Sequence, residues 1–150
     1  MRLALYQPDI PQNTGTILRM AACLNIPVDV IGPTGFDMSD RALKRAALDY
    51  LPFVDLTRFV SWEAFQAARQ VAVPPRRLVL LSSKAATNYL DFAFAAGDTL
   101  LLGRESAGVP DAVHAAVDAR IAIPMREGLR SLNIAVAAAM VVGEAIRQGR

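Results

Sequence analysis

Short runs of aliphatic residues alternate with helix-like segments along the whole chain. Most of these runs consist of Val, Ile and Leu, and they cover residues 3–6, 28–31, 54–60, 78–82, 99–103 and 120–124. Strands that are apolar along their whole length are typical of a parallel sheet with helices on both faces. The sequence therefore predicts an α/β fold with a parallel sheet, in a single domain over residues 1–150.

The segments between these runs carry start signals for helices. Ser, Thr or Asn at such a position accepts hydrogen bonds from the first free backbone N–H groups, and Pro fits the first helical turn. The expected helices, each with its start signal in parentheses, are residues 13–24 (Asn13 or Thr14), 39–48 (Ser39), 61–70 (Ser61) and 110–117 (Pro110).

The last expected helix, residues 132–147, has no polar residue between Ile134 and Val142. A helix that is apolar on all sides must be buried on all sides. A chain of 150 residues can hardly cover one completely, and four alanines in this stretch allow another backbone to approach closely. We therefore expect a homodimer whose interface uses this helix.

Composition narrows the class of protein. The chain is 53% apolar and 20% charged, which is typical of a globular protein. It has no apolar run of membrane-spanning length and no secretory signal before its early prolines, so we expect a cytoplasmic protein.

A single cysteine and a single histidine, His114, argue against a metal site, and His114 is expected on the surface of its helix. Of the 16 basic residues 14 are arginines, which fits either RNA binding or codon usage.

Polar residues gather where three late strands end, at residues 81–84, 103–110 and 123–133. Ligands of parallel α/β proteins bind at this edge of the sheet. Each residue also has a plainer explanation: Glu105 can face a helix start, Ser131 can cap the last helix, and Arg19 can be a solvated arginine. The glycine-rich patterns of dinucleotide and nucleoside triphosphate sites are absent.

Three segments, taken together and in this order, resemble the motifs of the SPOUT methyltransferases. They are IPQNTGTILRMAA (10–22), LLLGRESAGVP (100–110) and IPMREGLRSLNIAVAAAM (123–140). The chain is most similar to the small tRNA (cytidine/uridine-34)-2'-O-methyltransferases, and residues 5–36 and LKRAALDY (43–50) share that similarity. The resemblance implies a Rossmann-like SPOUT fold with a C-terminal trefoil knot, a homodimer, and S-adenosylmethionine (SAM) as methyl donor without a metal.

The same resemblance implies the site residues. The SAM pocket falls on Leu81, Gly103, Ile123, Ser131 and Leu132. The polar catalytic set falls on Asn13, Arg19, Glu105, Ser131 and Asn133. A ribose hydroxyl must lose a proton during methylation. Arg19 and Glu105 are both candidates for the group that accepts this proton, and Arg19 is not chosen outright because a guanidinium is a poor base.

The implied activity is SAM-dependent 2'-O-methylation of the tRNA wobble nucleotide, a cytidine or modified uridine at position 34. The protein would then bind the anticodon loop with its own surface, through basic clusters at residues 41–45 and 76–84. Two alternatives stay open. One is the same chemistry on a different tRNA or rRNA ribose, and the other is a knotted dimer that binds SAM or RNA without catalysis.

Overall fold

The computed structural model describes residues 1–39 and 41–149. Six strands form one sheet in which every pairing is parallel, in the order β3-β2-β1-β5-β4-β6. This confirms the predicted parallel α/β architecture. The strands are β1 (Arg2–Tyr6), β2 (Val28–Ile31), β3 (Leu56–Phe59), β4 (Leu78–Leu81), β5 (Thr99–Leu102) and β6 (Ala119–Ile121).

Five α-helices and one 3₁₀ helix lie in the described part of the chain. They are α1 (Pro11–Leu24), α2 (Arg41–Ala47), the 3₁₀ helix η1 (Leu48–Phe53), α3 (Trp62–Gln70), α4 (Asp111–Ala115) and α5 (Ile134–Gln148). Asp40, which belongs to the helix expected over 39–48, lies outside the described residues. None of the helices described is long and apolar enough to cross a membrane.

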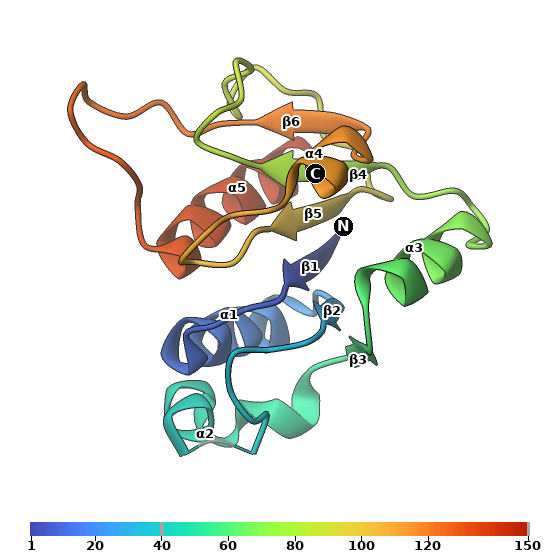
Figure 1. The fold of residues 1–150 in the computed structure, drawn as a ribbon, viewed down its shortest axis with the longest axis vertical. Coiled ribbons are helices and arrows are strands. Elements are labelled where there is room, and N and C mark those ends of the chain that lie inside the picture. The colour runs from blue at the N-terminus through green and yellow to red at the C-terminus, as the bar shows by residue number, and fades with distance from the viewer. Residues whose placement is uncertain (40, 150) are drawn as a thin grey trace.

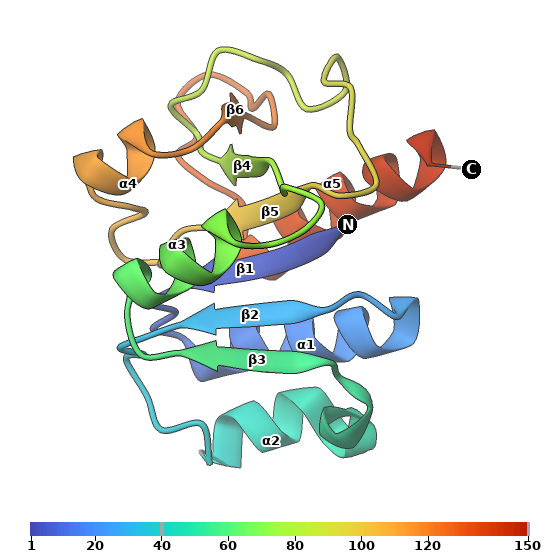
Figure 2. The same ribbon diagram turned by 90° about the vertical axis from the view of Figure 1, so that its right-hand side faces the viewer.

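The helices cover both faces of the sheet, as Figures 1 and 2 show. Helices α1, α2 and α5 pack on one face, where Leu3 and Leu5 of β1 point. Helices α3 and α4 pack on the other face, where Ala4 and Tyr6 of the same strand point. Alternate residues of one strand therefore reach two different cores, which explains why the strands are apolar throughout.

Two helix starts differ from the sequence prediction. Helix α1 begins at Pro11 with Ile10 before it, so Asn13 lies inside the first turn and does not cap the helix. Helix α5 is capped by Asn133 and not by Ser131. The Oδ1 atom of Asn133 accepts hydrogen bonds from the N–H groups of Ala135, at 2.9 Å, and Val136, at 3.4 Å. Ser61 does cap α3, as predicted, by accepting a hydrogen bond from the Ala64 N–H.

Helix α5 is only partly covered within one chain. Ala135, Ala138, Val141 and Val142 are buried in the core. On the opposite side, Val136 is 52% exposed and Met140 is 37% exposed. The all-round apolar pattern of α5 therefore corresponds to one face against the sheet and one apolar face that this chain leaves open.

Candidate functional site

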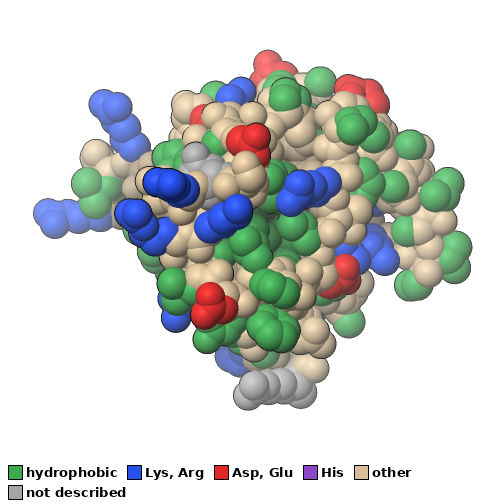
Figure 3. Space-filling view, turned by 90° about the horizontal axis from the view of Figure 1, so that it is seen from below, with side chains coloured by type: hydrophobic (Ala, Val, Ile, Leu, Met, Phe, Trp, Pro, Cys, Tyr) green, Lys and Arg blue, Asp and Glu red, His purple; other side chains and the backbone are tan. Residues whose placement is uncertain are grey.

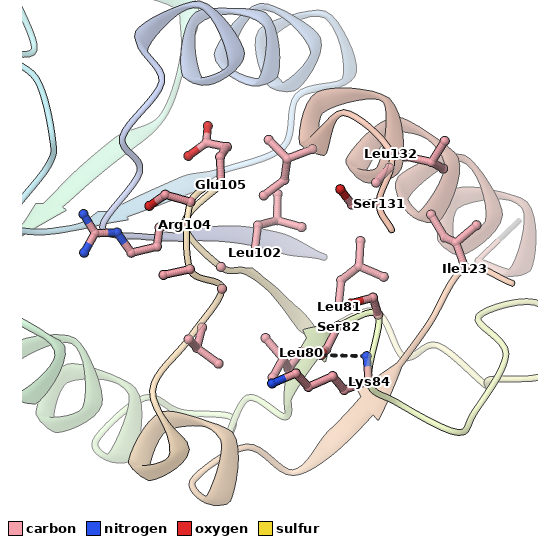
Figure 4. A pocket seen from close by; sticks show the side chains of 18 of the residues that line it. Leu80, Leu81, Ser82, Lys84, Leu102, Arg104, Glu105, Ile123, Ser131 and Leu132 are labelled. Atoms are coloured by element: carbon pink, nitrogen blue, oxygen red, sulfur yellow. Dashed lines mark hydrogen bonds between the residues drawn. The ribbon is translucent and has the colours of Figure 1, made fainter. Parts of the chain in front are cut away.

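A cavity of about 840 Å³ opens at the carboxyl ends of the central strands. Figure 4 shows its walls, which come from the ends of β4 and β5, the residues after β6 and the segment before α5. All five residues expected to bind the methyl donor line this cavity: Leu81, Gly103, Ile123, Ser131 and Leu132. The cavity has the size of a small-molecule site, and both aliphatic and polar side chains line it.

A tight turn after β5 forms one wall of the cavity. The Gly108 N–H donates to the Arg104 carbonyl at 2.7 Å, and the Arg104 N–H donates to the Gly108 carbonyl at 3.0 Å. Gly108 has a φ of +65°, and a Cβ atom on Gly103 would lie 2.8 Å from the Gly108 carbonyl carbon. Both glycines are therefore needed for this turn. The turn places the Glu105 side chain toward α1, as Figure 4 shows.

A chain of hydrogen bonds joins the three predicted motif segments beside the cavity. Glu105 accepts from the Asp9 N–H at 3.1 Å and from the Asn13 Nδ2 at 3.3 Å. The Asn13 Oδ1 in turn accepts from the Asn133 Nδ2 at 2.9 Å. Three of the five polar residues of the predicted catalytic set therefore contact one another across 92 and 120 positions of sequence.

The direction of each hydrogen bond in this chain is fixed by chemistry. An ionised carboxylate only accepts, so Glu105 holds the Asn13 amide with its nitrogen toward the carboxylate and its oxygen toward Asn133. Asn133 must then donate through its nitrogen, which leaves its oxygen for the first N–H groups of α5. The orientation of the α5 start is thus linked to the charge on Glu105.

Two neighbouring carboxylates share this corner of the site. Burial raises the pKa of Glu105 above its ordinary value, and the side chain of Asp9 beside it adds to the rise. The pKa of Asp9 is lowered, mainly through its interaction with the Glu105 side chain, although burial acts in the opposite direction. Ser106 Oγ and the Glu105 N–H both donate to Asp9, and Arg104 lies 3.6 Å from its carboxylate. Glu105 is therefore the member of the pair that holds a proton to higher pH.

The segment before α5 presents free backbone groups to the cavity. Ser131 and Leu132 lie outside any helix or strand, and the backbone hydrogen bonds found within residues 1–39 and 41–149 include neither of them. Unpaired peptide groups beside aliphatic walls suit a ligand with a flat polar edge, such as a purine. Among the described residues, no group of three or more His, Cys, Asp or Glu side chains could hold a metal ion.

Arg19 does not lie at the cavity. It is exposed on α1, and the cavity lining, which includes Asn13 from the same helix, does not include it. Its guanidinium lies over the ring of Tyr50 in η1, 5.3 Å from the ring centre. The structure of one chain therefore brings together Asn13, Glu105, Ser131 and Asn133 but leaves Arg19 apart from them.

Sequence reasoning missed two residues at this site. Asp9 was not singled out, because only the fold brings it to Glu105, 96 positions away. His114 was expected on the surface, but it is partly buried and lines the cavity. Its Nδ1 accepts from the Arg120 Nε at 2.8 Å. The PDAV sequence before His114 gave no sign of this, since it also fits an ordinary surface helix.

The chain is similar over nearly its whole length to known proteins. Residues 1–143 match the SpoU rRNA Methylase family. A relative from Beijerinckia indica subsp. indica, named tRNA (cytidine(34)-2'-O)-methyltransferase, is 60% identical over 97% of this chain and 90% of its own. A protein of the same name from Escherichia coli (strain K12) is 37% identical over 99% of this chain and 93% of its own.

Solved structures agree with these matches. One that concerns the 2-OH methylation of C/U34 on tRNA has a TM-score of 0.92 and 43% identity, and the match covers 99% of this chain and 97% of the other. The SpoU methyltransferase AviRb from Streptomyces viridochromogenes, in complex with the cofactor AdoMet, has a TM-score of 0.89 and 30% identity, over 99% of this chain and 60% of AviRb. The chain therefore belongs to the SpoU rRNA Methylase family.

Proposed function

We propose that this protein transfers a methyl group from SAM to the ribose 2'-hydroxyl of the tRNA wobble nucleotide, a cytidine or modified uridine at position 34. The observation that carries the proposal is the hydrogen-bonded chain from Glu105 through Asn13 to Asn133 at the edge of one cavity. It unites the three segments that resemble methyltransferase motifs, in a chain whose full-length relatives are named for this reaction.

The cavity suits SAM in volume and lining. Aliphatic side chains of Leu81, Ile123 and Leu132 can enclose an adenine ring, while the backbone at Gly103 and Ser131 can bind its polar edge and the ribose. SAM, when bound, would supply a methyl group on a positively charged sulfur. The chain's own contribution is then mainly to hold the two reactants in line.

The 2'-hydroxyl must lose its proton as its oxygen attacks the methyl carbon. The Glu105 carboxylate lines the cavity beside Asn13, and its raised pKa makes it a better proton acceptor than an ordinary glutamate. It already accepts two hydrogen bonds, however, one from the Asp9 N–H and one from Asn13 that belongs to the Asn13–Asn133 link. We therefore assign Glu105 to orienting this link and keep it beside Arg19 as a candidate acceptor, with Ser131 and Asn133 holding the ribose or the donor.

A homodimer would explain the position of Arg19. Helices α1 and α5 pack against each other, and each has an exposed stripe on the outer side. On α5 this stripe holds Val136 and Met140, and it continues to Leu132 at the cavity rim. On α1 the stripe holds Arg19. A second copy that covers these stripes would bring its own Arg19 toward the cavity of the first, and we propose that Arg19 acts there on the substrate phosphate or hydroxyl.

Exposed cations supply a surface for tRNA. Figure 3, which views the molecule from the side of α2, shows Lys and Arg side chains gathered toward the left of that face, with acidic side chains scattered over it. Arg41, Lys44 and Arg45 of α2 are all exposed. Contacts from such groups to phosphates would make tRNA binding sensitive to salt.

We also propose a domain organisation, a location in the cell and a chain topology that fit this activity. We propose one domain over residues 1–150, a cytoplasmic location that follows from a tRNA substrate, and a trefoil knot near the C-terminus. The knot is supported by the path of the chain: Thr87 and Tyr89 in the β4–β5 connection hydrogen-bond to Ala122 directly after β6. The chain then returns from the sheet edge to α5, which packs on α1.

Nucleoside mass spectrometry tests the proposal directly. The purified protein and SAM are incubated with total tRNA from a strain that lacks this protein, and with unmodified tRNA transcripts. The digests are then searched for new 2'-O-methylated nucleosides, and fragment analysis maps their position. We expect 2'-O-methylcytidine or 2'-O-methyluridine at position 34, and loss of both products with Asn13→Ala.

Other outcomes would each remove a part of the proposal. A methyl group at another tRNA or rRNA position would keep the chemistry and overturn the substrate, an outcome that the rRNA name of the family makes worth testing. Binding of SAM without methylation of any RNA would overturn the enzymatic function and favour a binding protein.

A further inference from the structure

We infer that Tyr50 is a positioning residue that holds the Arg19 guanidinium in the orientation needed for methyl transfer. This inference rests on the proposed function, in which Arg19 serves the reaction. The observation behind it is the contact between the two side chains: the guanidinium carbon lies 5.3 Å from the centre of the Tyr50 ring. That distance is within the range of a cation–π interaction.

The ring is the contact that fixes Arg19. Within residues 1–39 and 41–149, the Arg19 guanidinium makes no ion pair and no hydrogen bond to another side chain or to the backbone. An exposed arginine without a partner samples many rotamers, and ordering it at the moment of reaction carries an entropic cost. A ring face restrains the guanidinium plane and leaves its N–H groups free for a phosphate or hydroxyl.

The backbone before Tyr50 is strained in a way that this contact would explain. Leu48, the first residue of η1, has a φ of +51°, a left-handed conformation that leucine rarely adopts. This residue turns the chain from α2 into η1, and η1 packs against α1. Strained backbone is retained where the surrounding structure or the function requires it. Here the turn carries Tyr50 back to the helix that holds Arg19.

The position of Tyr50 indicates which of its atoms matter. Its hydroxyl has no hydrogen-bond partner among the described residues, so the structure gives it no role beyond the ring. Phe53 provides a matched comparison, because it lies in the same 3₁₀ helix and is 74% exposed, yet no cation lies over its ring in the described chain.

The first test compares Tyr50→Leu, Tyr50→Phe and the control Phe53→Leu, each as the full-length protein. We measure kcat and KM for tRNA methylation, SAM affinity by calorimetry, and thermal unfolding. We expect Tyr50→Leu to lower kcat between about 2-fold and about 30-fold, the range of a cation–π contact. SAM affinity should be unchanged and the loss of stability should not exceed the free energy of this one contact, while Tyr50→Phe and Phe53→Leu should keep wild-type kcat.

The second test combines Tyr50→Leu with Arg19→Ala. If the ring acts through the guanidinium, Tyr50→Leu should lower kcat no further when Arg19 is already absent. An equal loss in both backgrounds would overturn the inference, as would equal losses from Tyr50→Leu and Phe53→Leu. Wild-type kcat in Arg19→Ala alone would instead overturn the proposed role of Arg19, so the two failures are distinguishable.

Discussion

At the scale of single residues, Asn133 combines two tasks that one substitution can separate. Its oxygen caps α5 by accepting from the Ala135 and Val136 N–H groups, and its nitrogen donates to Asn13. Aspartate has the oxygen but lacks the donor, whereas alanine has neither. Asn133→Asp and Asn133→Ala therefore separate the effect of the helix cap on stability from the effect of the hydrogen bond to Asn13 on the site.

We expect Asn133→Ala to lose about 1 kcal/mol of stability through the missing cap, which corresponds to roughly 2–4 °C in Tm for a chain of this size. Asn133→Asp should unfold within about 0.5 kcal/mol of the wild type, because a carboxylate caps a helix start well. Both should lose most methylation activity, since neither can donate to Asn13. An active Asn133→Asp enzyme, measured alongside thermal unfolding, would contradict the role given to this hydrogen bond.

The pKa shifts of Glu105 and Asp9 lead to a second prediction for single residues, on how the stability of the protein depends on pH. Burial and Asp9 raise the pKa of Glu105 in the folded protein above its ordinary value of 4.5. The protonated form is therefore favoured by folding, so this contribution to stability is complete below about pH 4.5 and is lost as pH rises through the raised pKa. The lowered pKa of Asp9 has the opposite sign and contributes stability above its ordinary value of 3.8.

Glu105→Gln removes the titrating group, so the stability of this variant should fall less than that of the wild type as the pH rises above the ordinary glutamate pKa of 4.5. Urea unfolding across this range measures the difference. Glu144→Gln is a suitable control, because hydrogen bonds from Arg147 and Gln148 hold the pKa of Glu144 at about 2, outside the range. Parallel profiles for the wild type and Glu105→Gln would show that Glu105 does not titrate as the structure indicates.

At the scale of secondary-structure elements, the crossing of α1 and α2 depends on one glycine. A Cβ atom on Gly15 would lie 2.5 Å from the Leu43 carbonyl oxygen and 2.7 Å from the Ala46 Cβ. The two helices therefore approach more closely than any side chain on α1 would permit at this point. Since α1 also holds Asn13 and Arg19, its position affects the site.

Gly15→Ala should consequently destabilise the protein by about 1–3 kcal/mol, the usual cost of overpacking, even though alanine favours a helix by about 1 kcal/mol. Gly97→Ala is the matched control, because a Cβ atom there meets nothing within 4 Å and its stability should change little. Chemical denaturation of the two variants measures both effects. Equal stability of Gly15→Ala and the wild type would mean that α2 can move away from α1 without cost.

The elements themselves could be predicted well, because strand and helix patterns are local. The apolar runs gave all six strands, although β6 is shorter than expected and ends at Ile121. Capping residues were harder to assign. Ser131 and Asn133 are both good caps, and the choice depends on Asn13, which lies 120 positions away. The pairing of Asp9 with Glu105 likewise depends on β1 and β5 being neighbours, which no local pattern reveals.

At the scale of the whole molecule, the remaining question is which chain supplies Arg19 to a given cavity. One chain holds Asn13, Glu105 and Asn133 together at its own cavity and Arg19 outside it, on the exposed side of α1. Two chains arranged symmetrically would exchange this residue, so that each cavity is completed by its partner. This arrangement also gives the exposed apolar face of α5 a covering surface.

Dimers formed from two different variants test which chain supplies Arg19 to each cavity. Arg19→Ala and Glu105→Ala are each expected to keep only a small residual activity alone. After the two are unfolded together and refolded in equal amounts, half of the dimers should be mixed, and one cavity in each should have both Glu105 and a partner's Arg19. The mixture should then recover about one quarter of wild-type activity, in proportion to the intact sites. If Arg19 serves its own chain, every cavity lacks one residue and the mixture stays at the residual activity of the single variants, although light scattering still finds dimers. A monomer in that measurement would remove the dimer from the proposal altogether.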